Sequence, residues 1–243
     1  MIDEVTITRT LDGRVLEILL NRPEQANAIT PAMTEAITAA LRSLDPQIRV
    51  VLLHGSGDDF CTGRSAAMPK PGTRATALDL RKLISDPVLD FYQVLREVPV
   101  ATIAVVQGRA AGVGCALAAL ADVTIASNTA SFQVPEMNHD IAPTLVMNAL
   151  ADRIPRAALA RLVLTRDAVD AAEAKSLGLI GVVVAPDALN EENDRLVTQL
   201  ANNSVATIRS VKAFLSTGPE TSFASRKELA ALLNCVATAE SFR

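Results

Sequence analysis

Short, continuous apolar runs that alternate with helical patterns constrain the fold more than any other feature of this sequence. Three such runs are Val50–Leu53, Val100–Val106 and Val123–Ala126. They lack the polar alternation of a half-exposed strand, and such runs are typical of strands covered on both faces. Because helical patterns lie between them, the sequence predicts a layered α/β core.

The N-terminal segment adds a hairpin and a helix to this core. Val5–Thr10 and Val15–Leu20 are β-prone runs separated by an Asp-Gly pair, which favours a tight turn. Thr30 and Pro31 have the residue types of a helix N-cap and first helical position, and apolar residues repeat after them at helical spacing.

From Thr144 onward the pattern is mostly helical, with one short strand predicted at residues 182–184 after a glycine that ends a helix. No linker composition separates the two parts. We therefore expect an α/β core over residues 1–185 and a helical C-terminal region over residues 186–243.

Composition argues against several functional classes. The net charge is −4 and the pI is about 5.3, and no basic patch appears, so nucleic-acid binding is not expected. The apolar run Ala110–Ala121 ends at Asp122, short of the roughly 20 residues of a membrane span. The N-terminus also lacks the pattern of a secretory signal. The sequence predicts no membrane association.

Cysteine and histidine usage favours a cytoplasmic, metal-free protein. The cysteines at 61, 115 and 235 form no CxxC pair, and their odd number at wide spacing is typical of a reducing compartment. His54 and His139 are the two histidines and are far apart, so no zinc-type ligand set is expected.

Two glycine turns follow predicted strands. Gly112-Val113-Gly114 opens a helix, but Leu117 stands where a dinucleotide fingerprint needs its third glycine. The turn that ends in Thr62-Gly63 exposes the amide of Arg64. If both turns lie at one edge of the sheet, their N–H groups form an oxyanion hole. The alternative is close packing of the second turn's helix on the sheet.

A third polar feature is QVPEMNHDIAP, residues 133–143, which brings Glu136, His139 and Asp140 close in sequence. A helical spacing of three and four would place these side chains on one face. The same residues beside a proline are also typical of a solvated turn. The residues alone leave both interpretations open.

The sequence resembles the crotonase, or enoyl-CoA hydratase/isomerase, superfamily. Five segments look like successive signatures of that family and occur in its order: NRPEQANAI (21–29), HGSGDDFCTGRS (54–65), PVATIAVVQGRAAGVGCALAALADVTIAS (99–127), SFQVPE (131–136) and DAAEAKSLGLIGVVV (170–184). The resemblance implies a spiral of β-β-α units with a helical C-terminal trimerisation region. It also implies a homotrimer or dimer of trimers and an acyl-CoA thioester as ligand, with coenzyme A as part of the substrate and no other cofactor.

The resemblance also implies roles for individual residues. The backbone amides of Arg64 and Val113 correspond to the two oxyanion donors, and Glu136 to one of the two glutamates of the hydratases. The other glutamate is replaced by Ala116. The positions that match the coenzyme A-binding segments are Gln25, Ala26, Ala28, Arg64 and Ala66, and Ala116 is expected to line the substrate site.

Loss of one carboxylate favours a reaction that needs a single acid/base. Hydration requires one group for water and another for the α-carbon proton, whereas moving a proton between two carbons needs only one. We therefore expect an isomerase-type or atypical hydratase reaction with Glu136 as the acid/base. The alternatives are a hydrolase that uses His139 or Asp140 in the substrate pocket, and a non-catalytic acyl-CoA-binding protein.

Overall fold

The structure is a computed structural model that describes residues 3–65, 74–240 and 242. Its main sheet is parallel except for the antiparallel hairpin formed by the first two strands. The strands, in their order across the sheet, are β1 (Val5–Thr10), β2 (Val15–Leu20), β3 (Val50–Gly55), β4 (Ala101–Val106), β6 (Val123–Ser127) and β9 (Val182–Val184). The predicted α/β core and hairpin are confirmed.

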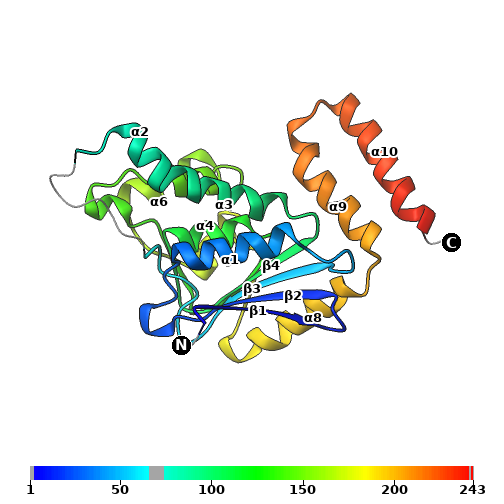
Figure 1. The fold of residues 1–243 in the computed structure, drawn as a ribbon, viewed down its shortest axis with the longest axis horizontal. Helices are drawn as coiled ribbons and strands as arrows, with labels where there is room; N and C mark the ends of the chain where they lie inside the picture. Colours follow the sequence, from blue (N-terminus) through cyan, green and yellow to red (C-terminus); the bar gives the residue numbers. More distant parts are fainter. Residues whose placement is uncertain (1–2, 66–73, 241, 243) are drawn as a thin grey trace.

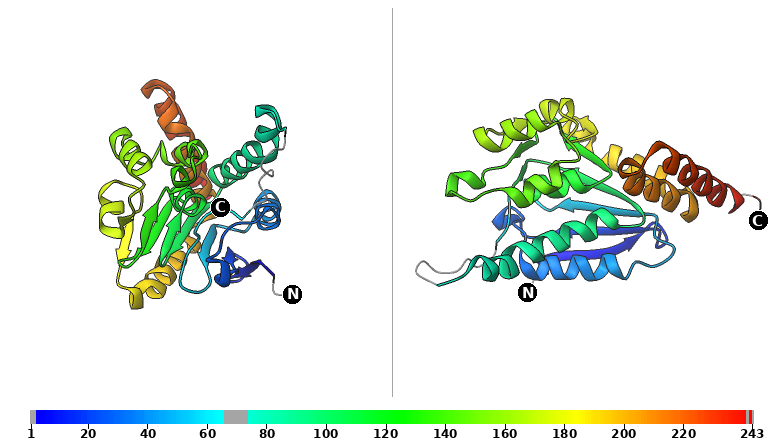
Figure 2. Two further views of the ribbon diagram at one scale, coloured as in Figure 1. Left: turned by 90° about the vertical axis from the view of Figure 1, so that its left-hand side faces the viewer. Right: turned by 90° about the horizontal axis from the view of Figure 1, so that it is seen from above.

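Helices cover both faces of this sheet (Figures 1 and 2). One face packs against α1 (Pro31–Arg42), α3 (Asp86–Glu97) and α4 (Val113–Leu120), and the other packs against α8 (Leu189–Ala201). Each central strand therefore has apolar neighbours on both sides, which explains its continuous apolar sequence. The Thr30 hydroxyl caps α1 by accepting a hydrogen bond from the amide of Met33.

A second, smaller sheet was not expected from the sequence. It consists of β5 (Arg109–Ala111), β7 (Ser131–Gln133) and β8 (Val169–Asp170), in that order. The sequence was expected to be mostly helical from Thr144, whereas Val169 and Asp170 pair with β7 and α7 begins only at Ala171. Strands this short carry no readable periodicity, and long-range pairing defines them.

The helical C-terminal region is present. Its first long helix, α8, belongs to the packed core, whereas α9 (Val205–Thr217) and α10 (Phe223–Glu240) pack on each other and project away from the sheet (Figure 2). The sequence predicted a helical region here but no bounds for α10. None of the helices in the described ranges combines the length and apolar composition of a membrane span.

The remaining helical segments connect these layers. The segment before α3 contains a short α-helix and a π-helical turn, and Pro87 lies in the first turn of α3, where proline is tolerated. The α-helical segments are α2 (Ala77–Leu80), α5 (Thr144–Leu150), α6 (Arg156–Thr165) and α7 (Ala171–Ser176), the π-helical turn is η2 (Arg81–Ser85), and the 3-10 turns are η1 (Pro23–Gln25), η3 (Glu136–His139), η4 (Pro186–Ala188) and η5 (Gly218–Glu220).

Candidate active site

The two predicted glycine turns lie side by side. The chain leaving β3 forms a parallel bridge between Cys61 and Ala110 of β5, and the amide of Ala111 donates to the carbonyl oxygen of Cys61 at 2.9 Å. Gly63 and Gly112 both have positive φ, at 130° and 53°, which L-residues rarely adopt. Their glycine identity is therefore a requirement of the two turns.

The Glu136 side chain lies close to both glycine turns. A Cβ atom added at Gly112 would lie 2.6 Å from Oε1 of Glu136 and 3.8 Å from Cα of Gly63. The α4 helix also approaches the first turn so closely that a Cβ at Gly114 would overlap the carbonyl oxygen of Cys61. These contacts bring together three elements that are distant in sequence.

The backbone amides that follow the two glycines have no acceptor among the described residues. Gly63 and Ser65 form the hydrogen bonds of a parallel bridge with Ile29, so the intervening amide of Arg64 points the other way. Val113 is the first residue of α4, and the first amides of a helix lack intrahelical partners. Both N–H groups are therefore available to a ligand.

Glu136 begins η3, directly after Pro135 and three residues after the end of β7. Its side chain is half-buried, and Oε2 is enclosed without a hydrogen-bond partner in the described part of the chain. Burial raises the pKa of this carboxyl group because removal from water disfavours the charged form. A carboxylate with a raised pKa is a better base than an exposed glutamate.

His139 and Asp140 lie in the same turn but are exposed, unlike Glu136. Neither side chain forms a hydrogen bond within the described residues, and neither lines the cavity beside the two glycine turns. Asp140 has a φ of 54°, and its amide closes the turn by donating to the carbonyl oxygen of Met137. The predicted cluster of three polar groups is therefore divided, with only Glu136 facing the turns.

The predicted coenzyme A-binding segment lies against the first glycine turn. Thr62 donates from its amide and its hydroxyl to the carbonyl oxygen of Ala26, at 3.0 and 3.2 Å. Gln25 is exposed, whereas Ala26 and Ala28 are half-buried. Ala66, which was predicted to bind the same group, lies outside the described residues.

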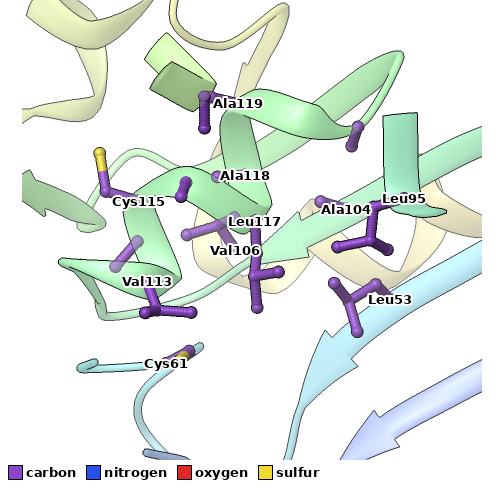
Figure 3. Close-up of a cluster of buried hydrophobic side chains, with 14 of the residues drawn as sticks. Leu53, Cys61, Leu95, Ala104, Val106, Val113, Cys115, Leu117, Ala118 and Ala119 are labelled. Atoms are coloured by element: carbon purple, nitrogen blue, oxygen red, sulfur yellow. The ribbon is translucent and has the colours of Figure 1, made fainter. Parts of the chain in front are cut away.

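The two buried cysteines next to the turns are packing residues. Cys61 and Cys115 lie around Val113 and α4 in a dense apolar cluster (Figure 3). Burial raises their pKa values to about 11 and about 12, so both thiols stay protonated at neutral pH. Ala116, the position without the expected glutamate, is fully buried in the same helix.

A small cavity of about 80 Å³ adjoins the turns. Arg64, Val113 and Tyr92 are among its lining residues, and Tyr92 is the chain's single tyrosine. Sequence reasoning missed Tyr92 because it occupies an apolar position of α3, where an aromatic residue indicates core packing. The sequence feature that could have identified Tyr92 is its hydroxyl, a polar group on an otherwise apolar helix face.

In the described ranges, no group of three or more His, Cys, Asp or Glu residues is placed to hold a metal ion. His54 lies in β3, where its Nε2 pairs with Oε1 of Glu17 in the neighbouring strand at 2.8 Å, a contact within the sheet and away from the glycine turns.

Known proteins resemble this chain in sequence and in structure. The sequence profile described as enoyl-CoA hydratase/isomerase matches residues 10–235. A probable enoyl-CoA hydratase of Mycobacterium bovis is 33% identical over 223 residues, which are 89% of this chain and 83% of that protein.

Solved structures agree with this relationship. An enoyl-CoA hydratase from Mycobacterium smegmatis superimposes with a TM-score of 0.87 at 29% identity, covering 96% of this chain and 90% of the other. A structure from Thermobifida fusca, described as a putative enoyl-CoA hydratase in complex with acetoacetyl-CoA, has a TM-score of 0.84 at 28% identity and covers 98% and 95% of the two chains. The chain belongs to the enoyl-CoA hydratase/isomerase family, which is the crotonase superfamily that its motifs resemble.

Proposed function

We propose that this enzyme forms an enolate from an acyl-CoA thioester and moves a proton along the acyl chain with Glu136 as its single acid/base. The observation that carries the proposal is the arrangement around Gly112, because Glu136 and Gly63 both lie close to this residue. That geometry places one carboxylate beside two backbone amides without an acceptor in the described part of the chain.

The proposed reaction is the isomerisation of a 3-enoyl thioester. Glu136 removes a proton from C2, and the electron pair delocalises over the thioester carbonyl and the C3–C4 double bond. The resulting dienolate oxygen accepts hydrogen bonds from the amides of Arg64 and Val113. Glu136 then returns the same proton at C4, which leaves a 2-enoyl thioester. No other reactant is consumed, so one carboxylate is sufficient.

The proposal also assigns a position to each end of the substrate. The thioester carbonyl lies between the two amides, and the coenzyme A portion extends along Gln25, Ala26 and Ala28, a segment that Thr62 ties to the first turn through the carbonyl oxygen of Ala26. The acetoacetyl-CoA in the related Thermobifida fusca structure supports a thioester ligand of this class.

The test is the Glu136→Gln variant assayed with 3-enoyl- and 2-enoyl-CoA thioesters and mass-spectrometric detection of products. We expect the wild type to interconvert the two double-bond positions and the variant to lose at least about 10²-fold in turnover. Acyl-CoA affinity should remain nearly unchanged, because the amides are backbone groups. The matched control is Glu191→Gln, an exposed carboxylate on α8. Full activity of Glu136→Gln would contradict the proposal.

Atypical hydration is the second candidate, and the hydratase names of the relatives favour it. In that case the wild type would add water to a 2-enoyl thioester despite Ala116. The Ala116→Glu variant separates the two candidates. Under the isomerase proposal, hydration appears only when the second carboxylate is introduced, whereas comparable hydration by the wild type would favour the hydratase. The exposed positions of His139 and Asp140 give no support to a hydrolase that uses them.

A further inference from the structure

The Tyr92 hydroxyl is a buried polar group whose presence packing does not explain. The side chain of Tyr92 is 2% exposed, and its oxygen has no hydrogen-bond partner among the described residues. A buried hydroxyl without a partner destabilises the folded state, because the group loses its bonds to water and gains none. A phenylalanine would fill the same space without that cost.

This hydroxyl belongs to the candidate active site. Tyr92 lines the small cavity together with Arg64 and Val113, whose amides are the proposed oxyanion donors. Burial, and next the nearby charge of Glu136, raise the pKa of the Tyr92 hydroxyl. The phenol is therefore protonated at neutral pH and can donate a hydrogen bond to a ligand.

A second donor, the Arg64 guanidinium, lines the same cavity. No carboxylate of the described residues lies within 4.0 Å of it, and the sequence of residues 66–73, AAMPKPGT, contains no acidic residue. The facing acidic groups are Glu35, which is exposed at the cavity, and Glu136. The acyl side of the site thus presents two polar donors, and a hydrocarbon chain there would leave the enclosed Tyr92 hydroxyl without an acceptor.

We propose that Tyr92 determines acyl specificity by donating a hydrogen bond from its hydroxyl to an oxygen atom in the acyl group, beyond the thioester carbonyl. The inference rests on the proposed function, since it needs the thioester to bind at the two amides. A site built to hydrogen-bond an oxygen strongly disfavours an analogue that lacks it. The cavity of about 80 Å³ is far below the roughly 300–1,000 Å³ of drug-sized sites, so the acyl group is short.

The test compares three saturated four-carbon thioesters that differ in their oxygen atoms. Butanoyl-CoA has no additional oxygen, acetoacetyl-CoA has a neutral carbonyl and succinyl-CoA has a carboxylate. We expect calorimetry to show that the wild type binds one or both oxygen-bearing thioesters about tenfold more tightly than butanoyl-CoA. Which of the two binds more tightly identifies the oxygen as neutral or anionic.

The Tyr92→Phe variant should lose most of this preference, with butanoyl-CoA affinity changed less than about twofold. Its Tm should be equal to or above that of the wild type, since the hydroxyl has no partner to lose. The control is Thr34→Val, because the Thr34 hydroxyl also lines the cavity but already donates to the Thr30 carbonyl at 3.0 Å. This control should retain the preference for oxygen-bearing thioesters.

The outcomes separate this inference from the function on which it rests. If the wild type binds none of the three thioesters, the proposed function fails and the inference fails with it. If it binds all three but Tyr92→Phe keeps the wild-type preference, only the role of Tyr92 is overturned. A lower Tm with equal losses for all three thioesters would assign Tyr92 a structural role and would also overturn the inference.

Discussion

Burial of the Glu136 carboxyl group favours catalysis but lowers the stability of the folded chain. The carboxyl group lies beside two glycine turns with one oxygen enclosed and unpartnered among the described residues, and this burial raises its pKa. A raised pKa makes the carboxylate a stronger base, but it also means that the ionised form destabilises the folded chain. Functional sites commonly carry such a cost in stability.

The Glu136→Gln variant should therefore be more stable than the wild type at neutral pH. Because the pKa of Glu136 is raised in the folded state, its contribution to stability is present below the unfolded value of about 4.3 and is lost as the pH rises through the folded value. The Tm difference between variant and wild type should grow from near zero at about pH 4 to a positive value at pH 8. Thermal melts across this range provide the measurement, and a wild type that is more stable at pH 8 would contradict the assignment.

At the scale of elements, one partly buried ion pair connects α9 to the sheet. Nζ of Lys212 donates to both carboxylate oxygens of Asp122, at 2.7 and 2.8 Å, and only 6% of the Lys212 side chain is exposed. The same carboxylate accepts hydrogen bonds from the amide and hydroxyl of Thr102 in β4. Asp122, which ends the apolar run of α4 in the sequence, therefore joins its own turn to β4 and to α9.

Removing the lysine charge should weaken this connection measurably. Lys212→Met keeps most of the apolar side chain but leaves the Asp122 carboxylate without its cation, so we expect a loss of about 3 kcal/mol in the free energy of unfolding. Lys175→Met, at an exposed position of α7, is the matched control and should change the stability by less than about 0.5 kcal/mol. Equal denaturation midpoints for the two variants would show that the ion pair contributes little.

For the whole molecule, one chain supplies the strands of the main sheet and the helices that cover it, but the rest of the chain does not cover α9 and α10. Large apolar side chains are exposed on α9 and α10, and a groove of about 510 Å³ lies between these helices. The exposed residues are Val211, Leu215, Phe223, Leu232 and Val236. Large exposed apolar patches are typical of protein interfaces. This surface fits the trimerisation region that the family resemblance implies.

We therefore expect a trimer of about 77 kDa, three times the 25.7 kDa of one chain, by light scattering. Leu232→Glu should shift the mass toward the single chain, because a charge would be buried at the interface. Lys227→Glu changes a charge at an exposed position of the same helix and should leave the mass unchanged. A wild type that scatters as a single chain would rule out the trimer.

The sequence by itself determined the main sheet, its covering helices and the two glycine turns. Periodicity, caps and turn residues are local signals, and they placed β1, β2 and the start of α1 at the residues that the structure shows. The continuous apolar runs also predicted that both sheet faces are covered. Even the candidate base, Glu136, was identifiable, although only through the resemblance of its surrounding motif.

Only the tertiary structure decided which polar side chains meet. It brought Gly63, Gly112 and Glu136 to one point, placed Tyr92 beside them, and left His139 and Asp140 exposed. It also created the strands of the second sheet, which are too short to show a pattern. The physical reason is that a repeat along the chain specifies which face a residue occupies, whereas contacts between distant elements decide what lies opposite that face.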